Sequence, residues 1–172
     1  MENKKTSVFA VLLLLLALAA LAAGCGGRTA DPSRGTPEEG VFQIYYLDAS
    51  GTVLTPNEYR TETRDTDLLI AELMDQLRTV PNDLDSQSAI PERVEYRDFR
   101  REEMVVYLLF SDSYNAMSRD QEILCRAALA KTLTQAPGVN YISILAGEQP
   151  ILNAKGQPVG MMAGGDFIDS VS

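Results

Sequence analysis

Between positions 104 and 146 the spacing of the apolar residues changes twice. A continuous apolar run at 104–110 and a mostly apolar run at 139–146 are typical of buried strands. Between them, apolar residues recur at spacings of three and four, which predicts an amphipathic helix over 118–135. We expect this strand–helix–strand unit to form the centre of the fold.

The ends of the predicted helix carry clear local signals. Ser118 and Gln121 match the Ser-x-x-Gln capping box, in which side chains satisfy the free N–H groups of the first turn. Pro137 and Gly138 are typical of residues that follow a helix. The periodicity and both ends therefore agree on one helix.

The preceding residues predict further elements. Strands are expected at 41–47 and 53–61, joined by a turn in which Gly51 can adopt positive φ. Pro56 cannot donate to a ladder, so the second strand should lie at a sheet edge. A helix should begin at Asp65 or Thr66, and a strand at 94–99 should lead through a charged turn at 100–103 into the central unit.

The expected order is strand, strand, helix, strand, strand, helix, strand. This order predicts an α+β fold in which two helices pack on one face of a small mixed or antiparallel sheet, since that arrangement buries every apolar stripe. Residues 41–172 would form one domain, with a core at 41–152 and a tail at 153–172.

The N-terminal residues predict export and anchoring. Lys4 and Lys5 precede an apolar run at 8–18, as in a secretory signal, and Ala23-Gly24-Cys25 resembles the lipobox of bacterial lipoproteins. That resemblance implies cleavage after residue 24 and diacylation of Cys25. An uncleaved anchor is the alternative, but the run at 8–23 is shorter than the roughly 20 residues of a spanning helix. Residues 25–40 would then be the lipidated cysteine and a flexible linker.

Charge and composition exclude several classes of function. The 172 residues include 24 acidic and 15 basic residues, giving a net charge of −9, and no histidine. Such a surface should repel nucleic acid and anionic lipid, so the chain needs its lipid anchor to reach the outer face of the bacterial cytoplasmic membrane. Without histidine, the commonest general base and metal ligand are missing. We therefore expect no catalytic set, no cofactor and no metal.

Individual candidate sites are weak. Residues 83–87 alternate oxygen ligands as calcium loops do, but Ser88 and Val94 stand where such loops carry Gly and Glu. Ser111 has no base to activate it, and Cys125, without a histidine nearby, is expected to be a core residue. One cluster of basic residues could bind an acidic group of a partner. Because acidic residues lie next to it in the sequence, this cluster could instead form a solvent-exposed strand face with surface ion pairs. It comprises Arg93, Arg97, Arg100 and Arg101.

The ordered motifs from residue 41 to residue 168 together resemble the GerMN domain family, which takes its name from a spore-germination protein. The resemblance implies a non-enzymatic, extracytoplasmic domain, similar in fold to ring-building motifs of sporulation and secretion assemblies. The germination protein carries two such domains, whereas this chain has one. The motifs are residues 45–48, 73–77, 88–91, 105–108, 130–134, 139–144, 156–162 and 166–168.

These observations predict a membrane-anchored lipoprotein whose domain is a structural or interaction module at the cell envelope, serving sporulation or spore germination. The alternative is a binding module for a small ligand or for cell-wall glycan. Glycan sites usually need exposed aromatic platforms, and tryptophan is absent here.

Overall fold

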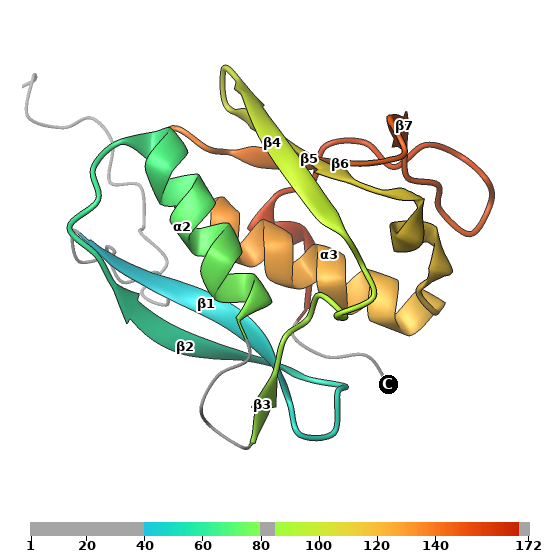
Figure 1. Ribbon diagram of the computed structural model, residues 1–172, viewed down its shortest axis with the longest axis horizontal. Coiled ribbons are helices and arrows are strands. Elements are labelled where there is room, and N and C mark those ends of the chain that lie inside the picture. Colours follow the sequence, from blue (N-terminus) through green and yellow to red (C-terminus); the bar gives the residue numbers. More distant parts are fainter. Residues whose placement is uncertain (1–39, 80–84, 169–172) are drawn as a thin grey trace, which may run out of the picture. The chain divides into compact units, whose positions relative to one another are not determined.

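The computed structural model describes residues 40–79 and 85–168, which form an α+β fold (Figure 1). The predicted class and order of the main elements are confirmed, with two-residue strands and short 3-10 helices added. The elements are β1 (Val41–Asp48), β2 (Leu54–Arg60), α2 (Thr66–Arg78), β3 (Ser86–Gln87), β4 (Tyr96–Glu102), β5 (Val105–Phe110), η2 (Asp112–Ala116), α3 (Arg119–Leu133), β6 (Tyr141–Ala146), β7 (Gln149–Pro150) and η3 (Gly164–Asp166).

The strands lie in two sheets, whereas the sequence predicted one. An antiparallel sheet has the order β2-β1-β3, and a mixed sheet has the order β4-β5-β6-β7. Only β5 and β6 run parallel, and α3 makes the crossover between them. The helices contact both groups of strands, since α2 and α3 pack on β1 and α3 also packs on β6.

Helix α3 is buried on several sides, which explains why a single sheet could not cover it. Most of its second half is buried on every side, including Ala128, Leu129, Thr132 and Leu133. A helix that is apolar around most of its circumference must be covered on more than one side. The two sheets provide that cover, so the helix predicted to be amphipathic is instead the central element of the core.

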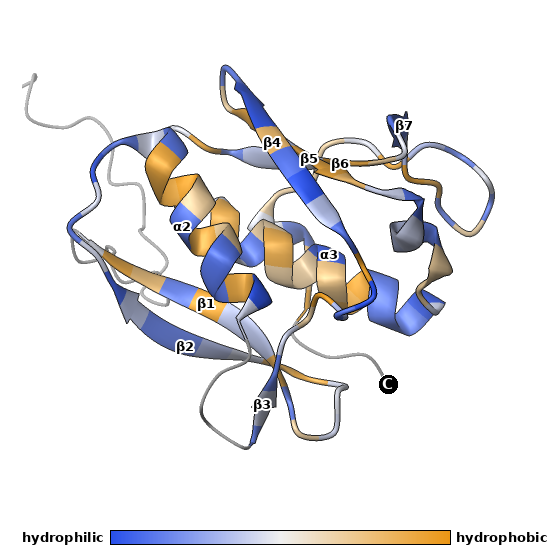
Figure 2. Ribbon diagram, in the orientation of Figure 1, coloured by the Kyte–Doolittle hydropathy of each residue, from blue (hydrophilic) through white to orange (hydrophobic). Residues whose placement is uncertain are grey.

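The core follows from alternation in the strands that face the helices. Phe42, Ile44 and Tyr46 of β1 are buried while their neighbours are only partly so, as a strand with one buried face requires. The inward residues of β5 and β6 are likewise buried. Figure 2 shows the matching concentration of apolar residues on α2, α3 and β1.

Several local predictions are confirmed. Ser118 caps α3 in a capping box with Gln121, and Asp65 caps α2 by accepting from two backbone N–H groups. Gly51 has φ of +71°, and the strand that contains Pro56 is an edge strand. None of the helices in 40–79 and 85–168 is long and apolar enough to cross a membrane.

The expected charged turn at 100–103 is wrong. Strand β4 continues through Arg100 and Arg101 to Glu102, and the turn falls at Glu103 and Met104, where Glu103 has φ of +52°. Charged residues can continue a strand when their side chains reach solvent or another residue. Arg100 contacts the ring of Tyr107, and Arg101 contacts Asp67.

Some predicted features lie outside the described residues. Cys25, the signal at 1–24 and residues 25–39 of the linker are among them, as are Asp83 and Leu84 of the calcium-like loop. The end of that loop, Ser86–Gln87, forms β3 and pairs with Leu47 and Asp48 of β1.

Candidate functional site

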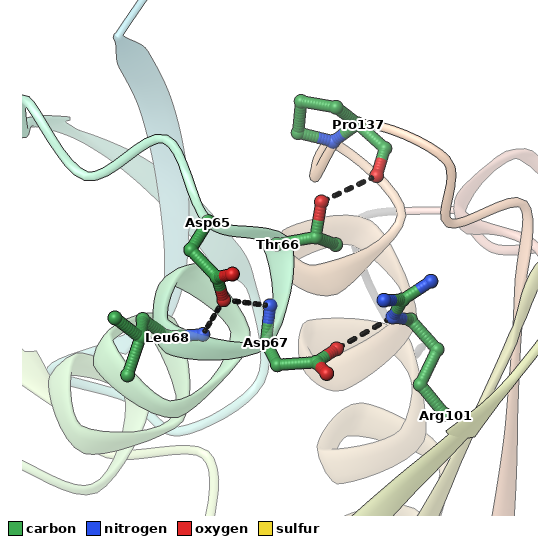
Figure 3. A network of polar contacts seen from close by, with 6 residues as sticks. All are labelled: Asp65, Thr66, Asp67, Leu68, Arg101 and Pro137. Atoms are coloured by element: carbon green, nitrogen blue, oxygen red, sulfur yellow. Dashed lines mark hydrogen bonds and ion pairs between the residues drawn. The ribbon is translucent and has the colours of Figure 1, made fainter.

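The four candidate arginines do not form one patch. Arg101 stands opposite the buried Val106 and therefore projects from β4 toward the helices. There its Nε lies 2.6 Å from Oδ1 of Asp67, in the first turn of α2 (Figure 3). This hydrogen bond raises the pKa of Arg101 above its usual value. Arg101 thus joins β4 to α2 within the domain.

Arg93, at the other end of the arginine segment, also contacts another element of the domain. The Nη2 of Arg93 donates to Oε1 of Gln121 at 2.8 Å, so this side chain reaches the first turns of α3. Gln121 is the same residue that completes the capping box of that helix. Arg93 therefore contributes to the position of α3.

Arg97 and Arg100 are the two arginines on the solvent side of β4. Arg100 stands opposite Tyr107 of β5, and its guanidinium carbon lies 4.8 Å from the centre of the Tyr107 ring. Arg97 is the extra residue of a β-bulge between Tyr96 and Asp98, and it is exposed. Bulges re-aim side chains at sheet edges, and β4 is an edge strand.

The outer face of the mixed sheet combines these charges with apolar groups. Val105, Tyr107 and Leu109 of β5 stand beside Tyr141, Ser143 and Leu145 of β6 on that face. Tyr141 is 41% exposed, and Met104 in the adjoining turn is 49% exposed. Asp98 and Glu102 of β4 stand on the same side as Arg100, so charges of both signs border the apolar groups. A face that mixes apolar and charged groups in this way suits contact with a protein surface. We call the face formed by β4, β5 and β6 the outer sheet face.

A second feature is a hollow of about 340 Å³ beside the first half of α3. Its walls come from η2, from the α3 face that carries Arg119, Glu122 and Arg126, and from the segment after β7. These three charged residues are spaced by three and four, so they share one side of the helix. The sequence analysis did not identify this hollow. The available signal was the helical spacing of three charged residues on a helix that is otherwise largely apolar.

Glu122 and Arg126 form a largely buried ion pair in this hollow. Oε1 of Glu122 lies 2.7 Å from Nε of Arg126, and their side chains are only 19% and 17% exposed. The Nε–H is not directed at that oxygen, so the contact is an ion pair without an aligned hydrogen bond. Tyr114 donates a long hydrogen bond of 3.4 Å to the same oxygen.

Burial governs the electrostatics around this pair. It raises the pKa of Glu122, and Arg126 opposes that shift by favouring the charged carboxylate. Burial also raises the pKa of the Tyr114 hydroxyl well above its usual value. The hydroxyl therefore stays protonated and can donate at any physiological pH.

The described residues offer little for catalysis or metal binding. Cys125 is fully buried, and burial raises the pKa of its thiol to about 12, which removes the thiolate that a nucleophile needs. Ser111 caps η2 by accepting from the N–H of Ser113, as its turn context predicted. Within 40–79 and 85–168, acidic residues and cysteine form no group of three that could hold a metal ion.

Two sheets that pack on two helices, with charged and apolar groups on an open sheet face, define a small α+β domain. A sequence model of the family described as "Germane: Sporulation and spore germination" matches residues 43–152. The chain therefore belongs to the Germane family. The tail motifs at 156–162 and 166–168 lie beyond the matched residues.

Solved structures agree on the fold. The first GerMN domain of the sporulation protein GerM from Bacillus subtilis is similar with a TM-score of 0.55 at 13% identity, covering 77% of this chain and 96% of that one. The tandem GerMN domains of the same protein match with a TM-score of 0.49 at 13% identity, over 77% of this chain and 45% of theirs.

A Clostridium perfringens protein named as a candidate lipoprotein also matches, with a TM-score of 0.49 at 20% identity, over 77% of this chain and 94% of that one. No curated protein matches this chain. The likeness to the first GerMN domain, at 13% identity, concerns the fold alone.

Proposed function

We propose that this chain is a lipoprotein of the outer face of the cytoplasmic membrane, and that its Germane domain is a non-catalytic interaction module in sporulation or spore germination. The family match over 43–152 carries the proposal, because the family is described by that process. The lipobox-like Ala23-Gly24-Cys25 supports the anchor. The buried, protonated Cys125 and the absence of histidine support a role without catalysis.

The outer sheet face is the proposed contact surface. Arg93 and Arg101 contact Gln121 of α3 and Asp67 of α2, so of the four arginines Arg97 and Arg100 are proposed to meet a partner. Arg100 also lies 3.3 Å from Glu102 of its own strand, in an exposed ion pair that a partner's carboxylate would have to replace. An acidic segment of another protein fits this surface, because guanidinium groups bind carboxylates with charge-assisted hydrogen bonds. Tyr107 and Tyr141 supply the aromatic area that interfaces favour.

The anchor is tested by metabolic labelling with an alkyne-bearing palmitate analogue in cells that express the full chain. We expect label in the wild type and none in Cys25→Ala, because the thioether to the diacylglycerol forms on that sulphur. Cys125→Ala is the matched control and should keep the label, since these are the two cysteines of the chain. Labelling of Cys25→Ala equal to wild type would contradict the anchor.

The contact surface is tested with a photo-crosslinking amino acid in place of Tyr107, in intact cells. Arg97→Glu combined with Arg100→Glu should weaken the crosslinks to an acidic partner. The control is Arg60→Glu combined with Arg64→Glu, which makes the same charge change at exposed positions in and after β2. Crosslinks that survive the first pair as well as the second would show that another surface makes the contact.

The hollow beside α3 favours the second candidate function, a binding module for a small ligand. Its volume lies at the lower end of the 300–1,000 Å³ range of ligand pockets. The residues that line the hollow indicate which class of ligand it could bind.

A further inference from the structure

The hollow beside α3 is cationic in an acidic protein. Arg119 and Arg126 line it together with one carboxylate, that of Glu122, while the whole chain carries a net charge of −9. Two guanidinium groups against one carboxylate leave one positive charge in this space. An anion that enters the hollow therefore gains a local attraction that the acidic surface elsewhere does not offer.

The guanidinium of Arg126 is largely buried and poorly satisfied by the domain. An arginine has five N–H donors, and a buried donor without an acceptor is costly. Among the described residues, Arg126 has the misaligned contact to Glu122 and a weak one from Nη1 to Sδ of Met162 at 4.0 Å. The Nε atom is enclosed beside Glu122, so a carboxylate in the hollow would supply oxygen acceptors to the terminal guanidinium nitrogens.

The remaining walls are mostly apolar. Met117 follows η2, Ile123 lies in the second turn of α3, and Ile151 and Leu152 come from the segment after β7. Leu152 is 59% exposed, so much of its apolar surface is open to a ligand in the hollow. A ligand with an apolar part next to its charge would cover these side chains.

We infer that this hollow binds an organic monocarboxylate. Its carboxylate meets Arg126 and Arg119, and a short apolar group contacts Ile123, Ile151 and Leu152. A phosphate dianion fits less well, because Glu122 shares the site and would repel the second negative charge. The same chemistry occurs in a free branched-chain acid and in the C-terminal residue of a peptide with an apolar side chain.

The test is calorimetric titration of the full chain in detergent micelles with three probes. Isovalerate represents the free acid, N-acetyl-leucine represents a peptide C-terminus, and N-acetyl-leucinamide has the same apolar group without the charge. We expect at least one acid to bind and the amide to bind at least about tenfold more weakly, because the charge-assisted bonds are lost. The acid that binds more tightly identifies the source of the carboxylate.

Variants locate the binding in the hollow. Arg126→Gln combined with Glu122→Gln removes both buried charges together, so that neither is left unpaired. This double substitution should weaken acid binding by about tenfold or more. Arg119→Gln changes an exposed position and keeps the buried Glu122–Arg126 pair, and it should also weaken acid binding. Arg100→Gln makes the same chemical change on β4 and should leave the affinity unchanged. Absence of binding by both acids, equal binding of the amide, or affinities unchanged in the hollow variants would overturn the inference.

Discussion

The side-chain amide of Gln135 hydrogen-bonds with the main chain of Gln43 in both directions. The N–H of Gln43 donates to Oε1 of Gln135 at 2.8 Å, and Nε2 of Gln135 donates to the Gln43 carbonyl at 2.7 Å. Close by, the N–H of Tyr45 donates to Oγ1 of Thr132 at 3.2 Å. Side chains from the last turn of α3 and the residues after it thus satisfy the part of the β1 edge that β3 does not pair with.

Replacement of Gln135 by Ala should destabilise the domain by about 1–3 kcal/mol, because a partly buried N–H and C=O of β1 both lose their partner. Urea denaturation of the full chain in detergent measures the loss. Gln149→Ala, an exposed glutamine on β7, is the control and should change stability by less than about 0.5 kcal/mol. Equal effects of the two substitutions would show that the amide pairing contributes little.

The hydrogen bond from the Tyr59 hydroxyl to Glu72 predicts a pH-dependent contribution to stability. This bond, with others from threonines, holds the pKa of Glu72 below its usual value. A carboxyl with a lowered folded-state pKa stabilises the fold above its unfolded-state pKa, and that stabilisation is lost as the pH falls through the folded-state pKa.

Tyr59→Phe should therefore cost about 1 kcal/mol at neutral pH, limited by solvent screening, and less once Glu72 is protonated. Denaturation curves from pH 7 to acid pH measure the difference from wild type. Tyr45→Phe removes a hydroxyl from a half-buried tyrosine of β1 and should show no comparable dependence on pH. A cost for Tyr59→Phe that stays constant across this range would contradict the assignment to Glu72.

The Arg101–Asp67 ion pair predicts that adjacent arginines of β4 differ in their effect on stability. Arg101→Ala should lower the melting temperature because it removes the link between β4 and α2, whereas Arg100→Ala, on the outer sheet face, should leave it nearly unchanged. A double-mutant cycle with Asp67→Ala should give a favourable coupling that decreases with added salt. Zero coupling at low salt would mean that the ion pair does not hold these elements together.

Cys125 should react with a thiol reagent only when the domain unfolds. The side chain is fully buried, and burial raises the pKa of the thiol to about 12, so both access and thiolate are missing in the native state. In a Cys25→Ser background, labelling should be slow in buffer and fast in denaturant. A cysteine introduced at the exposed Ser50 should label rapidly in both conditions. Rapid labelling of native Cys125 would show that α3 opens at this position.

The sequence by itself determined the local structure. Ser118, Gln121, Gly51 and Pro56 act on their own turn or strand, and their predicted roles match the structure because these effects need no distant partner. The apolar periods likewise gave the α+β class, the order of the main elements and the burial of Cys125. The N-terminal anchor and the partner contact remain predictions.

Only the tertiary structure decided how the strands divide between two sheets, which arginines contact the helices, and where the hollow lies. Gln135 is 92 residues from Gln43, and no local pattern shows that its amide will complete the edge of β1. Arg100 and Arg101 look alike in sequence, yet the pleat of β4 sends one to Tyr107 and the other to Asp67. These outcomes depend on which distant groups packing brings within hydrogen-bonding distance, and one-dimensional spacing does not encode that choice.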